Sequence, residues 1–312
     1  MTLDAVTTNA VPPETLTPSL SWATLAQTQQ TWLWRGHRIQ YTDVGSGPAL
    51  ILVHGFGAAI GHWRKNIPVL AAAGYRVLAL DLLGFGGSEK PPLDYSLDLW
   101  QALLTDFWTE KVHQPAIFIG NSIGALLSLM IAADYPQMTQ GAVLLNCAGG
   151  LNHRPEELPL PLRLLMGTFT RVVSSPWLGQ FMFDRIRQKH RIRATLNQVY
   201  GNRAAVTDEL VDMLYEPSCD PGAQQVFASI LTAPAGPRPI DLLPCVTCPL
   251  LVLWGEADPW TPVKGGAIFQ QAHWPAPIEF TAIPNTGHCP HDERPEIVNA
   301  RILAWLASLL SR

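Results

Sequence analysis

Short apolar runs recur along most of the chain and are separated by segments with helical periodicity. After a strand pair near residues 30–43, the runs cover residues 49–53, 75–80, 116–119, 141–146, 249–254 and 277–283. Runs that are apolar at every position are typical of strands buried on both faces of a sheet. Their alternation with helices predicts an α/β fold, with a mostly parallel sheet of eight strands and helices on both of its faces.

The pattern changes after the sixth strand. Prolines, helical periodicity and large apolar side chains replace the strands until about residue 244. We therefore predict a helical cap over residues 147–244, inserted into a core made of residues 31–146 and 245–312. Residues 1–30 are rich in Thr, Ala and Pro and are predicted to form a flexible N-terminal arm.

The cap is the segment expected to select the substrate. It is rich in apolar side chains over residues 158–166 and again at Phe169, Trp177, Phe181 and Phe183. These side chains either face an apolar substrate or form the core of the cap and its seal against the main domain, because any such cap must bury one face.

A basic run follows in the cap. Arg185, Arg187, Lys189, Arg191 and Arg193 alternate with other residues, which spreads their charges around a helix. This spacing favours a solvated face with some acidic partners. The alternative is attraction to an anionic membrane surface.

A serine lies at the apex of a predicted strand, turn and helix. The sequence Gly120-Asn121-Ser122-Ile123-Gly124 directly follows an apolar strand and precedes an apolar helix. So tight a turn strains the serine backbone and leaves room only for small flanking residues, which the glycines provide. The backbone amide of Ile123 would face an oxyanion formed at Ser122.

An acid and a base follow in the order that this chemistry needs. Asp258 comes just after the predicted strand at residues 249–254, and His288 lies in the loop after the next strand. In a Ser, Asp, His triad the imidazole takes the serine proton, and the carboxylate holds the imidazole in the correct tautomer. We therefore predict Ser122, Asp258 and His288 as the catalytic residues.

The second oxyanion donor is predicted to be the backbone amide of Phe56. It lies in the turn His54-Gly55-Phe56-Gly57, which follows a buried strand. His54 itself is interpreted as a hydrogen-bonded organiser of this loop.

Three further residues compete with the triad. His291 is a rival to His288, but it lies on the approach to the final helix. Asp81 begins a glycine-rich turn and is expected to hold a neighbouring loop. Asn146 occupies the end of the sixth strand and is a competitor of Asp258, but an amide cannot serve as a carboxylate.

Together these motifs resemble the α/β-hydrolase superfamily over roughly residues 30–312, which implies the α/β-hydrolase fold. Four stretches also resemble the pheophytinase and chlorophyll dephytylase branch of photosynthetic organisms: residues 34–41, 62–66, 121–124 and 287–293. Haloalkane dehalogenases and epoxide hydrolases resemble the chain around residues 54–88, but they use an aspartate where this sequence has Ser122. An alkyl-enzyme ester is therefore not expected.

Composition and charge restrict the partners and the cellular compartment that we expect. The chain has 21 basic and 25 acidic residues, a net charge of −4, which argues against a nucleic-acid partner. No apolar stretch reaches the roughly 18 residues of a membrane span. The first Lys or Arg is Arg35, so residues 1–30 match neither a secretory signal nor a transit peptide, and five cysteines fit a reducing compartment. We expect a cytoplasmic, cyanobacterial protein that is not secreted, with peripheral contact with anionic or thylakoid membrane left open.

The leading hypothesis is a serine-dependent carboxylic ester hydrolase that acts on a bulky apolar ester and needs no metal or organic cofactor. The resemblance implies the phytyl ester of chlorophyll or pheophytin as substrate. Two alternatives stay open. One is hydrolysis of a carbon–carbon bond in a meta-cleavage product, and the other is a non-catalytic ligand-binding protein on the same scaffold.

Overall fold

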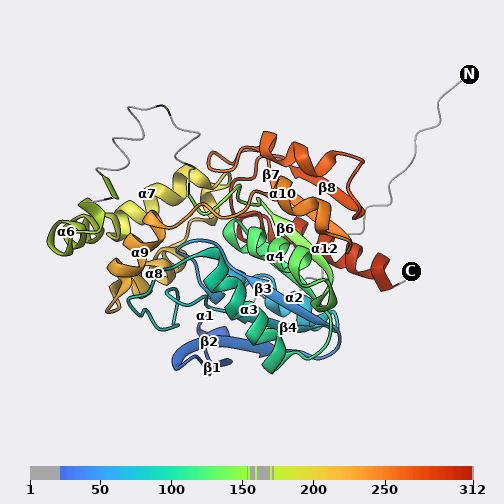
Figure 1. The fold of residues 1–312 in the computed structure, drawn as a ribbon, viewed down its shortest axis with the longest axis horizontal. Helices are drawn as coiled ribbons and strands as arrows, with labels where there is room; N and C mark the ends of the chain where they lie inside the picture. Colours follow the sequence, from blue (N-terminus) through green and yellow to red (C-terminus); the bar gives the residue numbers. More distant parts are fainter. Residues whose placement is uncertain (1–21, 153, 155–158, 160–168, 171, 311–312) are drawn as a thin grey trace, which may run out of the picture.

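The computed structural model describes residues 22–310 except residues 153, 155–158, 160–168 and 171. Eight strands form one sheet in the order β1-β2-β4-β3-β5-β6-β7-β8 (Figure 1). The pairs β1–β2 and β2–β4 are antiparallel, and the other pairings are parallel. The strands are β1 (Gln29–Trp34), β2 (His37–Val44), β3 (Ala49–Val53), β4 (Arg76–Leu80), β5 (Ala116–Asn121), β6 (Thr139–Leu145), β7 (Leu250–Gly255) and β8 (Ile278–Ile283).

Helices cover both faces of this sheet, which confirms the predicted fold class. One face packs against α3 (Leu97–Lys111), α4 (Ile123–Asp134) and α10 (Pro239–Leu242), and the other against α2 (Ile67–Ala72) and α12 (Pro295–Leu310). Strand β3 shows why its residues are all apolar. Ile51 and Val53 belong to the core cluster on one face, whereas Leu50 and Leu52 belong to the cluster on the other.

Part of the predicted N-terminal arm has secondary structure. Helix α1 (Trp22–Ala26) and the start of β1 both precede residue 31. Leu25 is fully buried in the cluster beneath the sheet, and the Thr28 hydroxyl lies 2.6 Å from that of Thr42. Apolar burial therefore holds residues 22–30 on the core, which differs from the expectation of a flexible arm as far as residue 30.

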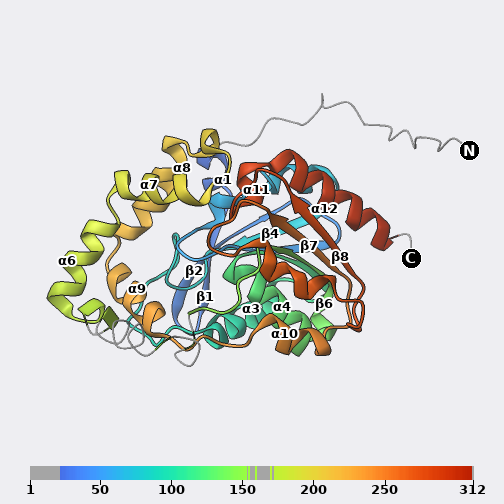
Figure 2. The ribbon, with the colours of Figure 1, turned by 90° about the horizontal axis from the view of Figure 1, so that it is seen from above.

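Four helices lie together at one end of the molecule, beyond the edge of the sheet (Figure 2). They fall in the chain between β6 and β7: α6 (Pro176–Ile186), α7 (Lys189–Val199), α8 (Asp208–Tyr215) and α9 (Ala223–Thr232). Helices α7 and α8 share a small apolar cluster, and the Phe183 and Phe227 rings join α6 to α9 at 5.3 Å between centroids. We call this segment the cap.

The two chain segments that join the cap to the core, residues 151–152 and 233–235, lie next to each other, and we call this junction the neck. The Leu151 backbone N–H donates to the Ala235 carbonyl at 2.7 Å. The Asn152 amide donates to the carbonyls of Ala233 and Ile230 at 2.8 and 2.7 Å. The two chain segments at the neck are therefore directly bonded to each other.

The apolar cap residues divide between two environments that the sequence could not separate. Phe169 and Phe183 line an internal cavity. Trp177 and Phe181 lie on the opposite face of α6 and are 89% and 55% exposed. Helix α6 turns Gly179 inward, where a Cβ would lie 2.1 Å from the Val173 carbonyl oxygen. Most of the apolar stretch at residues 158–166 lies outside the described residues.

The basic run of the cap is largely neutralised by neighbouring acids. Arg187 pairs with Asp184 at 2.7 Å, Lys189 pairs with Asp212 at 2.7 Å, and Arg193 pairs with Asp208. Three of the five cations therefore have the expected acidic partners, and one of these three, Arg187, also lines the cavity.

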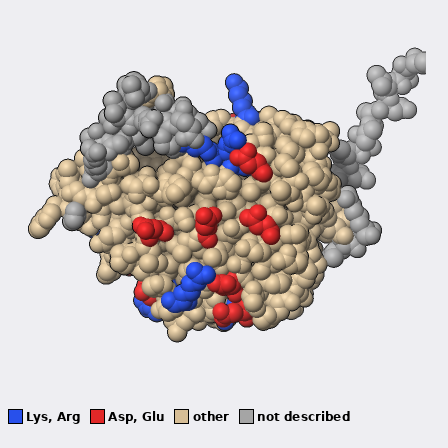
Figure 3. Space-filling model, viewed as in Figure 1, with Lys and Arg blue, Asp and Glu red and all other residues tan. Residues whose placement is uncertain are grey.

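Charged side chains of both signs lie on the surface. Acidic and basic side chains on the face drawn in Figure 3 form small groups of either sign. Among the helices that the structure describes, none combines the length and the apolar character needed to span a bilayer.

Candidate active site

The sharp turn around Ser122 lies where β5 ends and α4 begins. Ser122 has φ +57° and ψ −118°, a backbone conformation that costs a non-glycine residue roughly 1–3 kcal/mol. The glycines on either side are required by close backbone contacts. A Cβ on Gly120 would lie 2.1 Å from the Gly124 carbonyl oxygen, and one on Gly124 would lie 2.2 Å from that of Val53. Packing against β3 thus fixes the serine at the end of the sheet.

Asp258 and His288 form a buried hydrogen-bonded pair beyond the ends of β7 and β8. The Nδ1 atom of His288 lies 2.7 Å from Oδ2 of Asp258. The Oδ1 atom of Asp258 accepts the backbone N–H groups of Trp260 and Thr261 at 2.7 and 3.1 Å, and the Thr261 hydroxyl donates to Oδ2. Burial works to raise the pKa of Asp258, but the hydrogen bond and charge of His288, helped by Thr261, outweigh it and hold the pKa below its usual value. The carboxylate is therefore ionised and accepts a proton carried on Nδ1 of the imidazole.

Asn146 is a functional neighbour whose role the sequence did not reveal. Its side-chain amide donates to Oδ2 of Asp258 at 2.6 Å, and its carbonyl oxygen accepts the Gly255 N–H at 3.0 Å. The residue has φ +45°, just past β6. It thus orients the acid instead of replacing it. The signal in the sequence was a polar side chain at the end of an otherwise apolar strand.

Asn121 ties the serine turn to the histidine loop. Its side-chain amide donates to the His288 carbonyl at 2.9 Å and to the Leu145 carbonyl at 3.2 Å. The sequence placed Asn121 only as a neighbour of Ser122. The structure shows that it joins two of the three predicted catalytic residues through one side chain.

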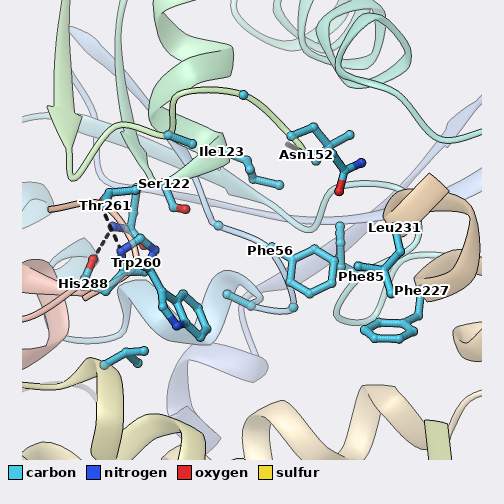
Figure 4. Close-up of a pocket in the computed structure, with 18 of the residues that line it drawn as sticks. Phe56, Phe85, Ser122, Ile123, Asn152, Phe227, Leu231, Trp260, Thr261 and His288 are labelled. Carbon is cyan, nitrogen blue, oxygen red and sulfur yellow. Dashed lines mark hydrogen bonds between the residues drawn. The ribbon is translucent and has the colours of Figure 1, made fainter. Parts of the chain in front are cut away.

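Ser122 and His288 line the same cavity, together with Phe56 and Ile123. Figure 4 shows the Ser122 side chain on the wall that also carries His288 and Trp260, with the Phe56 ring across the opening. A Cβ on Gly55 would lie 3.3 Å from the Ser122 Cβ, so the turn that carries Phe56 passes close to the serine. Among the described residues, no acceptor is bonded to the backbone N–H of Phe56 or Ile123. These amides are therefore free to bind an oxyanion.

Of the rival titratable residues, His54 and Asp81 have structural hydrogen-bond partners, whereas the described residues offer none to the buried ring nitrogens of His291. His54 accepts the Leu82 N–H at 3.0 Å, and burial lowers its pKa to about 4. Asp81 accepts the Ile60 and Gly87 N–H groups, and burial raises its pKa to about 6. Burial also lowers the pKa of His291 well below its usual value.

Comparison with known proteins identifies the family. The profile of the alpha/beta hydrolase family matches residues 50–301. The chain belongs to the alpha/beta hydrolase family. This confirms the resemblance drawn from the motifs, and the protein is a hydrolase of the α/β fold.

Individual relatives of this hydrolase have different substrates in their names. A chloroplast pheophytinase of Arabidopsis thaliana is 28% identical over 88% of this chain, which spans 65% of the length of that relative. A 2-hydroxymuconate semialdehyde hydrolase of a Pseudomonas species is 28% identical over 81% of this chain and 84% of its own. A solved meta-cleavage product hydrolase of Pseudomonas fluorescens shares the fold, with a TM-score of 0.73 at 24% identity, covering 91% of this chain and 99% of its own.

The cavity of this hydrolase has a volume of about 1640 Å³ and lies between the cap and the ends of the strands. Most of the side chains around it are apolar, among them Phe183, Leu196, Val199, Phe227, Leu231, Trp254, Trp260, Ile268 and Phe269. Two of its cations are neutralised, because Lys90 pairs with Asp220 at 2.8 Å and Arg187 with Asp184 at 2.7 Å. The space is large compared with the roughly 300–1000 Å³ of common ligand pockets.

Proposed function

We propose that the protein is a serine-dependent carboxylic ester hydrolase with Ser122, His288 and Asp258 as its triad. The observation that carries the proposal is the buried, ionised Asp258 bonded at 2.7 Å to His288, on the cavity wall from which the strained Ser122 projects. Each group has the environment that its role requires.

In this mechanism the Ser122 hydroxyl attacks the ester carbonyl while Nε2 of His288 takes its proton. The backbone amides of Phe56 and Ile123 stabilise the oxyanion of the tetrahedral intermediate. His288 then gives the proton to the leaving alcohol, which departs and leaves an acyl group on Ser122. Water attacks this acyl-enzyme with His288 again as the base, and the acid is released.

We further propose a bulky apolar ester as the substrate, with the phytyl ester of chlorophyll or pheophytin as the specific candidate. The volume of the cavity and its apolar walls support a large hydrophobic ester. The similarity to a pheophytinase supports the phytyl ester.

Hydrolysis of a carbon–carbon bond in a meta-cleavage product is the second candidate, supported by similarity to a 2-hydroxymuconate semialdehyde hydrolase. Such a substrate carries a carboxylate and favours unpaired arginines in the pocket. Arg187 is paired with Asp184, but Arg154 and Lys264 also line the cavity, so the assay with both substrate classes decides between the two candidates. A ligand-binding protein on the same scaffold is the third candidate, in which the triad is kept but turnover is incidental.

The deciding experiment compares the wild type with Ser122→Ala on a short chromogenic ester. We expect kcat to fall by at least about 10⁴-fold, because the nucleophile is lost while the pocket remains. Ser174→Ala, on the exposed surface of the cap, is the matched control and should keep wild-type turnover. Equal turnover by wild type and Ser122→Ala, or none by the wild type, would refute the triad.

The substrate is tested with purified protein and three compounds: chlorophyll, pheophytin and a meta-cleavage dienone. Release of phytol from either pigment, absent in Ser122→Ala, supports the ester candidate. Turnover of the dienone alone would replace it with carbon–carbon hydrolysis.

We also propose that the protein works in the cytoplasm and makes peripheral contact with the membrane that holds such a substrate. The support is the exposed apolar stripe of Trp177, Leu178 and Phe181 on α6, at the outer end of the cap (Figure 1). Sedimentation with phosphatidylglycerol vesicles tests this contact. Binding that does not weaken in Trp177→Ala would contradict a role for this stripe.

A further inference from the structure

Two motifs that the catalytic mechanism does not use lie in direct contact in the structure. Residues 62–66 follow β3, and residues 289–293 follow His288 and include α11 (Pro290–Glu293). The Lys65 ammonium donates to the Asp292 carbonyl at 2.7 Å, and the Asn66 amide donates to the His291 carbonyl at 3.2 Å. The Arg64 guanidinium pairs with the Asp292 carboxylate at 3.0 Å, with both side chains buried. Together the two motifs form one buried polar contact beside the histidine loop.

The end of the cap helix α7 is bonded to the same place. The backbone N–H of His288 donates to the Val199 carbonyl at 2.8 Å, so the predicted base is itself bonded to the cap. The hydroxyl of Tyr200 donates to the Asp292 carboxylate at 3.0 Å and lies 2.8 Å from Nε2 of His62. One cap tyrosine thus bridges both motifs.

Glu293 is the centre of this contact. Its carboxylate is only 3% exposed and accepts four backbone N–H groups. Oε2 accepts those of Gly201, Asn202 and Gly287 at 2.7, 3.1 and 3.0 Å, and Oε1 accepts that of Cys289 at 3.2 Å. Two donors belong to the cap, and the other two lie on either side of His288.

The two backbone segments also approach too closely for side chains. A Cβ on Gly287 would lie 1.9 Å from the Val199 carbonyl oxygen, and one on Gly201 would lie 2.7 Å from that of Asn285. At this separation neither segment can slide past the other without breaking the bonds to Glu293. The cap end and the histidine loop therefore have a single relative position.

We propose that Glu293 is a positioning residue for catalysis, which holds residues 199–202 of the cap and residues 287–289 of the histidine loop as one unit. Bonds on both sides of His288 fix its backbone, and the bond from Nδ1 to Asp258 then fixes its imidazole on the cavity wall that Ser122 shares. The catalytic part of this inference rests on the proposed ester hydrolysis. The coupling of the two segments does not depend on it.

Glu293→Gln is the test variant because it keeps the length and volume of the side chain. It replaces one acceptor oxygen with an NH₂ group, which cannot accept the N–H bonds that the carboxylate accepts. Glu296→Gln is the matched control: the same change three residues away, on the exposed start of α12. Tyr200→Phe is the second variant and removes only the bridging hydroxyl.

The first readout is kcat per active site, counted by burst titration with a chromogenic ester. We expect Glu293→Gln to lower kcat about 10- to 100-fold, with KM for a short ester within about two-fold, because small misplacements of a catalytic group are costly. Tyr200→Phe should lower kcat by about three-fold or more. A merely structural role would reduce the number of competent sites and leave kcat per site unchanged.

The second readout is hydrogen exchange, which needs no turnover. Exchange should rise in Glu293→Gln in the peptides covering residues 199–202 and 287–289 together, and in neither for Glu296→Gln. An unchanged kcat per site, or a rise in one segment alone, would overturn the proposal. If Glu293→Gln does not fold, the same two outcomes in Tyr200→Phe decide. If the wild type has no esterase activity, the proposed function fails and hydrogen exchange alone judges the coupling.

Discussion

The two ends of the cap are attached in different ways. The end of α7 is bonded to the core through buried polar groups, including the Val199 carbonyl, the Tyr200 hydroxyl and the N–H groups that Glu293 accepts. The outer helix α6 packs on α9 within the cap and presents Trp177 and Phe181 to solvent. Directional bonds set a position, whereas apolar packing tolerates variation in shape. The cap is thus specified where it meets the His288 loop and more adaptable at α6, whose Phe183 lines the cavity.

The largest effect is expected from Asp258→Asn, because Asp258 holds the histidine to which the α7 end of the cap is bonded. The amide should favour the wrong tautomer of His288, so kcat for a chromogenic ester should fall by about 10⁴-fold. Asp94→Asn, in an exposed loop, should leave kcat unchanged. A loss of less than about ten-fold would show that Asp258 is not the acid.

Phe183→Ala and Phe181→Ala compare the two faces of α6. Phe183 is 8% exposed and packs on Phe227, so its truncation should cost about 3 kcal/mol in the free energy of unfolding and raise KM for an apolar ester. Phe181 is exposed, and its truncation should change stability by no more than about 0.5 kcal/mol. Urea denaturation measures both, and similar values for the pair would contradict the division between inner and outer faces.

His62, which contacts Tyr200 at the α7 end of the cap, makes the free energy of unfolding sensitive to acid. Burial lowers its pKa to about 4, so the unfolded chain binds this proton near pH 6.5 while the folded chain does not. The free energy of unfolding therefore falls as the pH drops from 6.5 toward 4. His54 acts in the same sense, and Asp81, with its pKa raised to about 6, acts in the opposite one.

Replacing His62 isolates its contribution to the pH dependence of the free energy of unfolding. Between pH 7 and pH 5, His62→Asn should lose about 2 kcal/mol less stability than the wild type, as measured by urea denaturation at both values. His273→Asn, at an exposed histidine, is the control and should follow the wild type. An unchanged pH dependence in His62→Asn would show that His62 is not held neutral by the fold.

The smallest effect is expected at Trp177. Because this side chain is 89% exposed, Trp177→Gln should leave kcat for a short ester unchanged and shift stability by less than about 0.5 kcal/mol. A loss of kcat would indicate that the outer face of α6 communicates with the catalytic centre, and the contrast between the two ends of the cap would fail.

The fold could be predicted from local patterns because buried parallel strands are apolar at every position, as in β3 and β7. The candidate triad could be predicted because its chemistry demands particular residue types at the ends of strands. The limits of the N-terminal arm could not be predicted, because the burial of Leu25 depends on residues far along the chain.

The hydrogen bonds around the candidate triad also could not be predicted from the sequence. Asn146 and Asp258 are 112 residues apart, and Tyr200 and Asp292 are 92 apart, so no local pattern joins them. The outward direction of Trp177 and Phe181 was missed for a related reason. An apolar residue in a cap can face a cavity, a core or solvent, and only the placement of α6 decides between them.

The neck has a consequence for how such proteins diversify. Leu151 and Ala235 are one hydrogen bond apart, so the whole intervening segment behaves like an insert whose two ends meet. A different insert could be joined at these points without altering the sheet, as in domain insertion at adjacent chain ends. The bonds that Glu293 makes to Gly201 and Asn202 restrict that freedom, since any replacement must supply donors at the same place. The adjacent chain ends therefore make it simple to join a different insert. The contact with the histidine loop limits which inserts would fit.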